Sequence, residues 1–186
     1  MIRFTLFILA MMLTLSLSAQ KINQEVTTSN QQPFLIGRVD IDGLNSKSYQ
    51  SWYRSNHDAY IVDTKTITAI KNELATFKIL LFMGTWCGDS KREVPRFIKI
   101  LEAANFPMEN LKIIAVDRRK GYYKKSPTGE EWALSIKRVP TFIFYKDGKE
   151  VNRIIESPII SLEKDIESIL MNENYTPNYP NSLHFD

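Results

Sequence analysis

Two apolar runs in the middle of the chain are bounded by polar residues. The first, "FKILLFM", spans residues 77–83, and the second, "LKIIAVD", spans residues 111–117. Short runs that are apolar at nearly every position are typical of strands buried on both faces of a sheet. The sequence therefore predicts two central strands joined by a right-handed crossover.

Three segments show helical spacing of apolar positions. In residues 65–74, Ile67, Ile70 and Leu74 form one stripe, and Asp63 and Thr64 precede it as candidate caps. Residues 91–105, "KREVPRFIKILEAAN", lie between the two strands, and residues 161–170, "SLEKDIESIL", are amphipathic. We expect a helix at each of these places.

The stretch "TFIFYKDGKEVNRII" (residues 141–155) predicts a β-hairpin, because Asp147-Gly148 is a favoured two-residue turn. Before it, residues 118–129 form a polar loop rich in Lys and Tyr, and "EEWALSI" (residues 130–136) is a candidate short helix. This order of elements predicts an α/β fold with a mixed central sheet flanked by helices.

The segment before the first central strand has a different character. Residues 20–45 are largely polar and predict a tether followed by a short extended piece, "FLIGRVDI". Residues 46–60 carry four aromatic side chains at mixed helical spacings, which favours a helix that packs through them over an aromatic ligand cage. Residues 172–186 show no period and are expected to be a tail.

Composition supports one globular unit and limits the partners. Of 186 residues, 44% are hydrophobic, and 24 Lys and Arg residues stand against 21 Asp and Glu residues, a net charge of +3. This small, mixed charge does not indicate a nucleic-acid partner.

The first nineteen residues match a secretory signal peptide. Arg3 is followed by an apolar run over residues 4–17 and by the small residues Ser18 and Ala19. The run is shorter than the roughly 20 residues that span a membrane. Export to the periplasm or the extracellular space is therefore expected, with no stable membrane span after cleavage, and a retained anchor is the alternative.

Cys87 is the only cysteine in the chain. In an oxidising compartment cysteines usually form structural pairs. Cys87 has no partner in the chain, so it is a buried inert residue, a partner in an intermolecular disulfide, or a reactive thiol.

Two motifs give the chain a resemblance to the thioredoxin family. "WCGDSKREVP" (residues 86–95) is similar to the family's active-site segment W-C-G-P-C-K-x-x-x-P, and "RVPTFIFYKDGKEV" (residues 138–151) is similar to its cis-proline loop and hairpin. The resemblance implies a thioredoxin fold over residues 61–171, preceded by an N-terminal extension over residues 20–60.

The same resemblance implies the site residues. Cys87 would be the nucleophile, with Trp86 beside it and Ser90 one helical turn away. Val139, a cis-Pro140 and Thr141 would form the loop that binds an extended substrate peptide.

Three positions depart from the family's pattern. Ser90 stands where the family has its second, resolving cysteine, Asp89 replaces the usual proline, and Leu81 replaces a buried acidic residue that assists proton transfer. Cys87 at the first turn of a helix is expected to favour its thiolate form, and the Ser90 hydroxyl is a candidate donor to it. Asp89 places an opposing negative charge nearby.

The expected activity is thiol–disulfide exchange by a single thiol, with protein thiols or disulfides as partners and an external thiol to complete the reaction. No cofactor is expected. A redox-inactive peptide-binding or chaperone-like module is the alternative. A third interpretation, a glutaredoxin-like iron–sulfur site suggested by "CGDS", is disfavoured because Trp86, Lys91 and Pro95 follow the thioredoxin pattern.

Other candidates for chemistry are weaker. His57 and His184 are the only histidines, and their irregular spacing from Cys87 predicts no metal site. A hydrolytic dyad of His57 and Cys87 is a further alternative. The basic loop, which we define as Arg118, Arg119, Lys120, Lys124 and Lys125, is hypothesised to select acidic partners.

Overall fold

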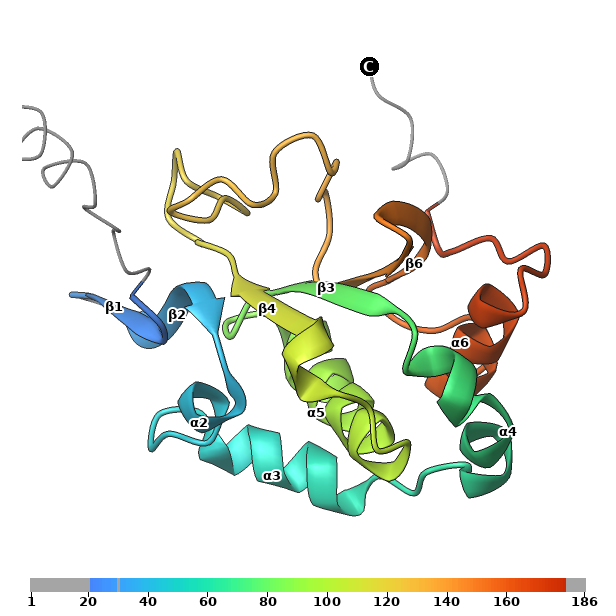
Figure 1. The fold of residues 1–186 in the computed structure, drawn as a ribbon. Helices are drawn as coiled ribbons and strands as arrows, with labels where there is room; N and C mark the ends of the chain where they lie inside the picture. Colours follow the sequence, from blue (N-terminus) through green and yellow to red (C-terminus); the bar gives the residue numbers. More distant parts are fainter. Residues whose placement is uncertain (1–20, 30, 180–186) are drawn as a thin grey trace, which may run out of the picture.

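A computed structural model describes residues 21–29 and 31–179 of the chain (Figure 1). The segment that matches a signal peptide and His184 both lie outside the described residues. None of the helices in the described part is long and apolar enough to cross a membrane.

The centre of the molecule is a six-stranded mixed sheet in the order β1-β2-β4-β3-β5-β6. Strands β3 and β4 are parallel, with Leu81 opposite Ile113, and every other neighbouring pair is antiparallel. The strands are β1 (Gln24–Thr28), β2 (Gln31–Val39), β3 (Lys78–Met83), β4 (Leu111–Ala115), β5 (Thr141–Lys146) and β6 (Lys149–Ile155).

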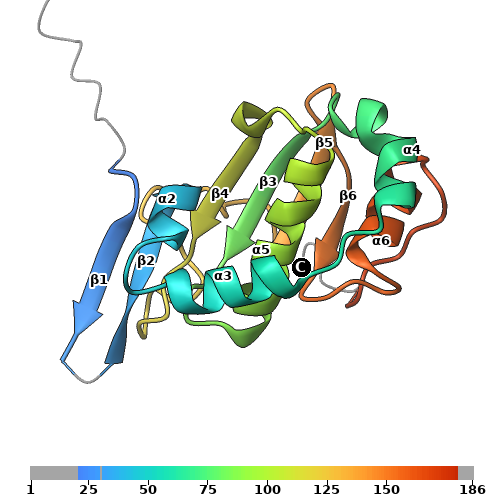
Figure 2. The same cartoon turned by 90° about the horizontal axis from the view of Figure 1, so that it is seen from below.

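The helices pack against one face of this sheet, with α3 and α5 side by side beneath it and α4 beside α6 near β6 (Figures 1 and 2). They are α2 (Ile41–Leu44), α3 (Gln50–Ala59), α4 (Thr64–Leu74), α5 (Gly88–Ala103) and α6 (Leu162–Leu170), with a 3₁₀ turn at Met108–Asn110. The helices expected from the apolar spacing before, between and after the strands are confirmed.

Strand β3 is covered on both faces of the sheet, which explains its continuous apolar sequence. Ile79, Leu81 and Met83 join the core under the helices, whereas Leu80 and Phe82 belong to a second apolar cluster on the opposite face. Successive side chains of a strand point to opposite faces. Both faces are covered, so both sets must be apolar.

The loop of residues 116–140, drawn in yellow and orange above the sheet in Figure 1, covers this second face. The helix expected over residues 130–136 is absent from it. Ala133 and Ser135 have positive φ angles of 60° and 51°, which interrupt a helix. Glu130 and Glu131 instead accept hydrogen bonds from Ser126, so their side chains close turns within the loop.

The expectation of a polar tether before residue 34 is wrong. Residues 24–28 form β1, and β2 pairs with β4 through Gly37 and Ala115. The N–H of Leu35 also donates to the hydroxyl oxygen of Thr85 at 3.0 Å. The N-terminal extension is therefore part of the sheet and contacts the segment that leads to Cys87.

Two local predictions are confirmed at the level of single residues. Asp147 and Gly148 join β5 to β6 with φ angles of 51° and 77°, as a type I′ hairpin turn requires. Tyr49, just before α3, and Tyr53 within it are both at most 3% exposed, and α3 packs on α5. Trp52 and Tyr60 are partly buried against the same core, so the aromatic residues of this segment serve packing.

Candidate functional site

Cys87 lies beyond the C-terminal ends of the parallel strands β3 and β4, as expected. It follows β3 after a turn closed by its own N–H donating to the carbonyl of Gly84 at 2.8 Å, and it is the N-cap of α5. Cys87 is half-buried at the N-terminus of this 16-residue helix, and its side chain makes no cap hydrogen bond to the helix. The N-terminal end of a helix is a favourable environment for negative charge.

The loop of residues 139–141 meets Cys87 from the other side. The thiol donates a hydrogen bond to the carbonyl of Val139 at 3.2 Å, and the Val139–Pro140 peptide bond is cis. Thr141 begins β5, and its hydroxyl donates to the carbonyl of Arg138 at 2.7 Å. The structure thus brings together residues that are more than fifty positions apart in sequence.

Trp86 forms a wall next to the thiol. Its indole N–H donates to the carbonyl of Val116 at 2.9 Å, just beyond β4, and its ring packs against Tyr123 with centroids 5.5 Å apart. The ring also lies close to Gly84, where a Cβ atom would come within 2.7 Å of it. Gly84 is therefore needed for the indole to take this position.

Ser90 lies near the site, but its hydroxyl serves another group. The side chain is fully buried, and its oxygen accepts a hydrogen bond from the N–H of Gly84 at 3.1 Å. The hydrogen bond that the sequence suggested from Ser90 to the Cys87 thiol is not among those of the described residues. Ser90 instead fixes the turn that carries Trp86 and Cys87.

The charge of Asp89 is compensated. Its carboxylate binds Arg92 at 2.9 Å, and Arg92 also contacts the buried Glu93. The hydrogen bond that Arg92 donates to Glu93 is the main cause that raises the pKa of Arg92, and the one it donates to Asp89 adds to it. The repulsion that Asp89 was expected to exert on a thiolate is therefore reduced.

The basic loop divides into two groups. Arg119 binds Asp117 at 2.6 Å, and Arg118 donates to the carbonyl of Gln32 at 2.7 Å, so both arginines hold the loop to its surroundings. Lys120 and Lys125 are exposed. The hypothesis of a surface that selects acidic partners thus applies to the lysines rather than to the two arginines.

Sequence reasoning gave no role to several residues around the thiol. Tyr123 packs on Trp86, and Arg138 binds Glu156 at 3.1 Å while its guanidinium lies 3.8 Å from the ring of Tyr179. The hydrogen bond that Arg138 donates to Glu156 raises the pKa of Arg138. These residues lie in or beside loops that lack a hydrophobic period, so the sequence carried no signal for them.

His57 takes no part in this site. Its ring nitrogens contact Asp58 at 3.0 Å and Glu102 at 2.8 Å, on the outer side of α3 and α5. The dyad of His57 and Cys87 is therefore wrong. The described residues contain no cluster of three or more His, Cys, Asp or Glu side chains that could hold a metal ion.

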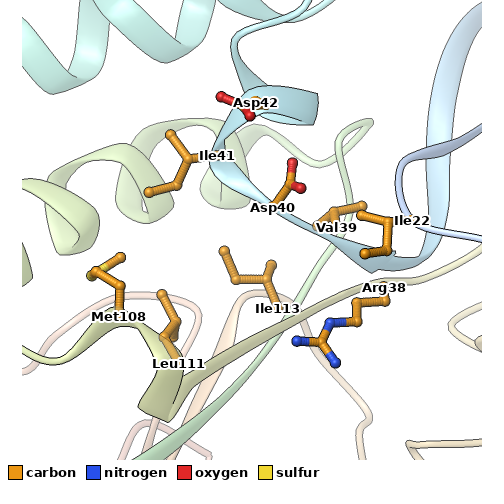
Figure 3. Close-up of a pocket in the computed structure, with 9 residues that line it drawn as sticks. All are labelled: Ile22, Arg38, Val39, Asp40, Ile41, Asp42, Met108, Leu111 and Ile113. Atoms are coloured by element: carbon orange, nitrogen blue, oxygen red, sulfur yellow. The ribbon is translucent and has the colours of Figure 1, made fainter. Parts of the chain in front are cut away.

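A cavity of about 310 Å³ lies at the opposite end of β4 from Cys87 (Figure 3). Leu111 and Ile113 of β4 line it together with Arg38 and Asp40 at the end of β2. Cys87 lies beyond the C-terminal end of β4, near Val116. The cavity and the thiol are separate features.

Comparison with known proteins gives consistent matches. A model of the thioredoxin family matches residues 43–166, more than half of the chain. "Thioredoxin-like protein R548" of Acanthamoeba polyphaga mimivirus is 31% identical over 104 residues, 53% of this chain and 66% of the viral protein. "Putative thioredoxin-5" of Dictyostelium discoideum is 32% identical over 96 residues, 52% of this chain and 84% of that protein.

A longer match is to "Thioredoxin-3, mitochondrial" of Saccharomyces cerevisiae, 27% identical over 136 residues, which covers 72% of this chain and 95% of the yeast protein. The chain spans slightly less than two thirds of the length of the viral relative. No solved structure matches the chain.

Proposed function

The chain belongs to the thioredoxin family, and from this we propose that Cys87 performs thiol–disulfide exchange on protein substrates by a monothiol mechanism. The observation that carries the proposal is the position of the thiol. It is half-buried rather than enclosed, caps α5, and lies against the Val139 carbonyl. A thiol at a helix N-terminus is favoured as a thiolate, which is the nucleophilic form.

The reaction has two exchanges. The Cys87 thiolate attacks one sulfur of a substrate disulfide, so that a Cys87–substrate disulfide forms, the substrate's own S–S bond breaks, and the second substrate sulfur leaves as a thiolate that takes a proton from water. An external thiolate then attacks the substrate sulfur of the mixed disulfide, so that a disulfide between that thiol and the substrate forms, the Cys87–substrate bond breaks, and Cys87 leaves as a thiolate. Ser90 carries no sulfur and cannot perform this second attack.

The backbone around Pro140 suits an extended peptide. The N–H of Val139 donates to no backbone carbonyl within residues 21–29 and 31–179, although the residue is buried to 2% exposure. An extended substrate segment would pair with it as an added strand does. This pairing would place a substrate sulfur beside Cys87, whose thiol contacts the Val139 carbonyl.

Export is a further part of the proposal. Residues 1–19 have the charge, apolar run and small residues of a signal peptide. Exported substrates and an external reducing thiol in the periplasm or outside the cell would then be the partners of Cys87.

A trapping experiment tests the function. Cells producing the native protein and the Cys87→Ser variant are acid-quenched, and disulfide-linked complexes are recovered and identified. Specific complexes with the native protein alone are expected, and they should disappear on reduction. Equal recovery of the same partners without a disulfide from both proteins would favour a redox-inactive binding module.

A further inference from the structure

Lys124 and Cys87 bind to the same short piece of backbone. The ammonium of Lys124 donates a hydrogen bond to the carbonyl of Lys137, and the thiol of Cys87 donates to the carbonyl of Val139, two residues later. Two steps along a chain span at most about 7 Å between Cα atoms. The ammonium and the thiol therefore bind carbonyl groups of one three-residue stretch, residues 137–139, just before Pro140.

An aromatic pair fixes the ammonium from its other side. The Nζ atom of Lys124 lies 5.1 Å from the ring centroid of Tyr123, and that ring packs on Trp86, the residue before Cys87. An ammonium is attracted to the face of an aromatic ring. These two contacts hold the ammonium of the half-buried Lys124 between the Tyr123 ring and the loop before Pro140.

The backbone of Lys124 has a conformation that a lysine rarely adopts. Its φ angle is 60°, and its N–H donates to the carbonyl of Asp117 at 2.8 Å to close a turn. A residue other than glycine is disfavoured in this left-handed region. Such conformations persist where the surrounding structure imposes them, and they occur often at functional sites.

The groups around Lys124 act on its pKa in opposite directions. Burial lowers the pKa of Lys124, Glu156 raises it, Arg138 lowers it and Cys87 raises it. Arg138 and Glu156 bind each other at 3.1 Å, so their charges largely cancel.

On the side of α5, Asp89 is paired with Arg92, and Lys91 follows Cys87 by one turn. Leu81, at the position of the family's buried acid, carries no charge. Among the described residues, no carboxylate pairs with the Lys124 ammonium, which binds the loop two residues before the carbonyl that Cys87 contacts.

We propose that Lys124 is a positioning residue that stabilises the thiolate of Cys87 through its fixed ammonium. The inference rests on the proposed function, because it assigns the loop a part in preparing the same nucleophile.

Alkylation of Cys87 by iodoacetamide provides the test, since the reagent reacts with the thiolate and the chain has one cysteine. The rate is measured from about pH 5 to about pH 10 for the folded native protein and for Lys124→Met and Lys124→Gln. We expect the rate near neutral pH to fall about threefold to tenfold in both variants, and the midpoint of the pH profile to rise. The rise follows from the loss of a positive charge near the thiolate.

Two further variants separate charge from structure. Lys124→Arg keeps the positive charge and should retain most of the native rate, whereas Lys149→Met removes an exposed charge next to the hairpin turn, at the start of β6, and should leave the profile unchanged. Unchanged profiles for Lys124→Met and Lys124→Gln would overturn the role of Lys124 and leave exchange by Cys87 intact. A native Cys87 that iodoacetamide does not alkylate at any pH would instead overturn the proposed function, and this inference with it.

Discussion

Ser90 shows how one substitution in a redox motif changes both chemistry and structure. Its hydroxyl oxygen accepts the N–H of Gly84, and the side chain is completely buried. An N–H group left unpaired in the interior costs about 1–3 kcal/mol. A serine at this position therefore stabilises the turn before Cys87 while it removes the thiol that would resolve a mixed disulfide.

Ser90→Ala should lower the free energy of unfolding by about 1–3 kcal/mol, because the Gly84 N–H loses its partner. Urea denaturation followed by tryptophan fluorescence measures this free energy of unfolding. The rate of Cys87 alkylation at neutral pH should change little, since Ser90 makes no hydrogen bond to the thiol in the described residues. A large drop in that rate without loss of stability would show that Ser90 acts on the thiol directly.

Ser90→Cys is the matched variant for the chemistry. It places a second thiol three residues after Cys87, the spacing at which the family resolves mixed disulfides. The variant should release bound substrate without an added thiol, which the native protein should not do.

At the scale of elements, the loop of residues 116–140 takes the place of the expected helix and supplies the second face of the site. A network of side chains holds it in shape. Burial alone would raise the pKa of Glu130, but hydrogen bonds from Ser126 and Thr128 outweigh this and lower the pKa to about 2. The ionised carboxylate therefore stabilises the folded loop.

The sign of the resulting pH dependence follows from that lowered pKa. The stabilisation is present above the ordinary glutamate pKa and is lost as the pH falls toward about 2. We expect the free energy of unfolding to decrease by at most about 3 kcal/mol over this range through Glu130 alone. Glu130→Gln should remove that part of the dependence in urea titrations at several pH values.

Glu109→Gln is the control, because Glu109 is exposed in the 3₁₀ turn before β4. Glu109→Gln should leave the decrease of the free energy of unfolding at low pH the same as in the native protein. Identical curves for the native protein and Glu130→Gln would contradict the role given to this carboxylate.

At the scale of the whole molecule, the N-terminal extension completes the sheet. Strand β2 covers the edge of β4, and Leu35 donates to Thr85 in the segment before Cys87. Phe34, Leu35 and Val39 are almost fully buried. An uncovered edge strand promotes association between chains.

A chain that begins at residue 46 should therefore be less stable than the full protein and should self-associate. Urea denaturation measures the first effect and light scattering the second. Equal stability, with a monomeric shortened chain, would contradict the view that the extension is part of the fold.

The sequence predicts the elements that depend on local pattern. The run over residues 77–83 is apolar because both faces of β3 are covered, and Asp147-Gly148 is a turn because both residues take positive φ angles. The position of Cys87 between β3 and α5 follows from the same patterns. Each of these features is determined by residues next to one another in the chain.

Features that depend on distant partners could not be predicted. β1 was missed because its residues alternate between half-buried and exposed and are mostly polar. The helix expected over residues 130–136 fails because Ser126 binds the carboxylates of Glu130 and Glu131. The use of the Ser90 hydroxyl by Gly84 likewise depends on how the turn folds back, which periodicity does not encode.

The central claim is that Cys87 begins an exchange that the chain cannot complete. Intact-mass spectrometry tests this most directly, on the folded protein incubated with a peptide disulfide and acid-quenched at intervals. We predict that one peptide becomes attached to Cys87 and stays attached until an external thiol is added, and that Cys87→Ser gains no mass. No adduct on the native protein, or an adduct that is released without added thiol, would contradict the account.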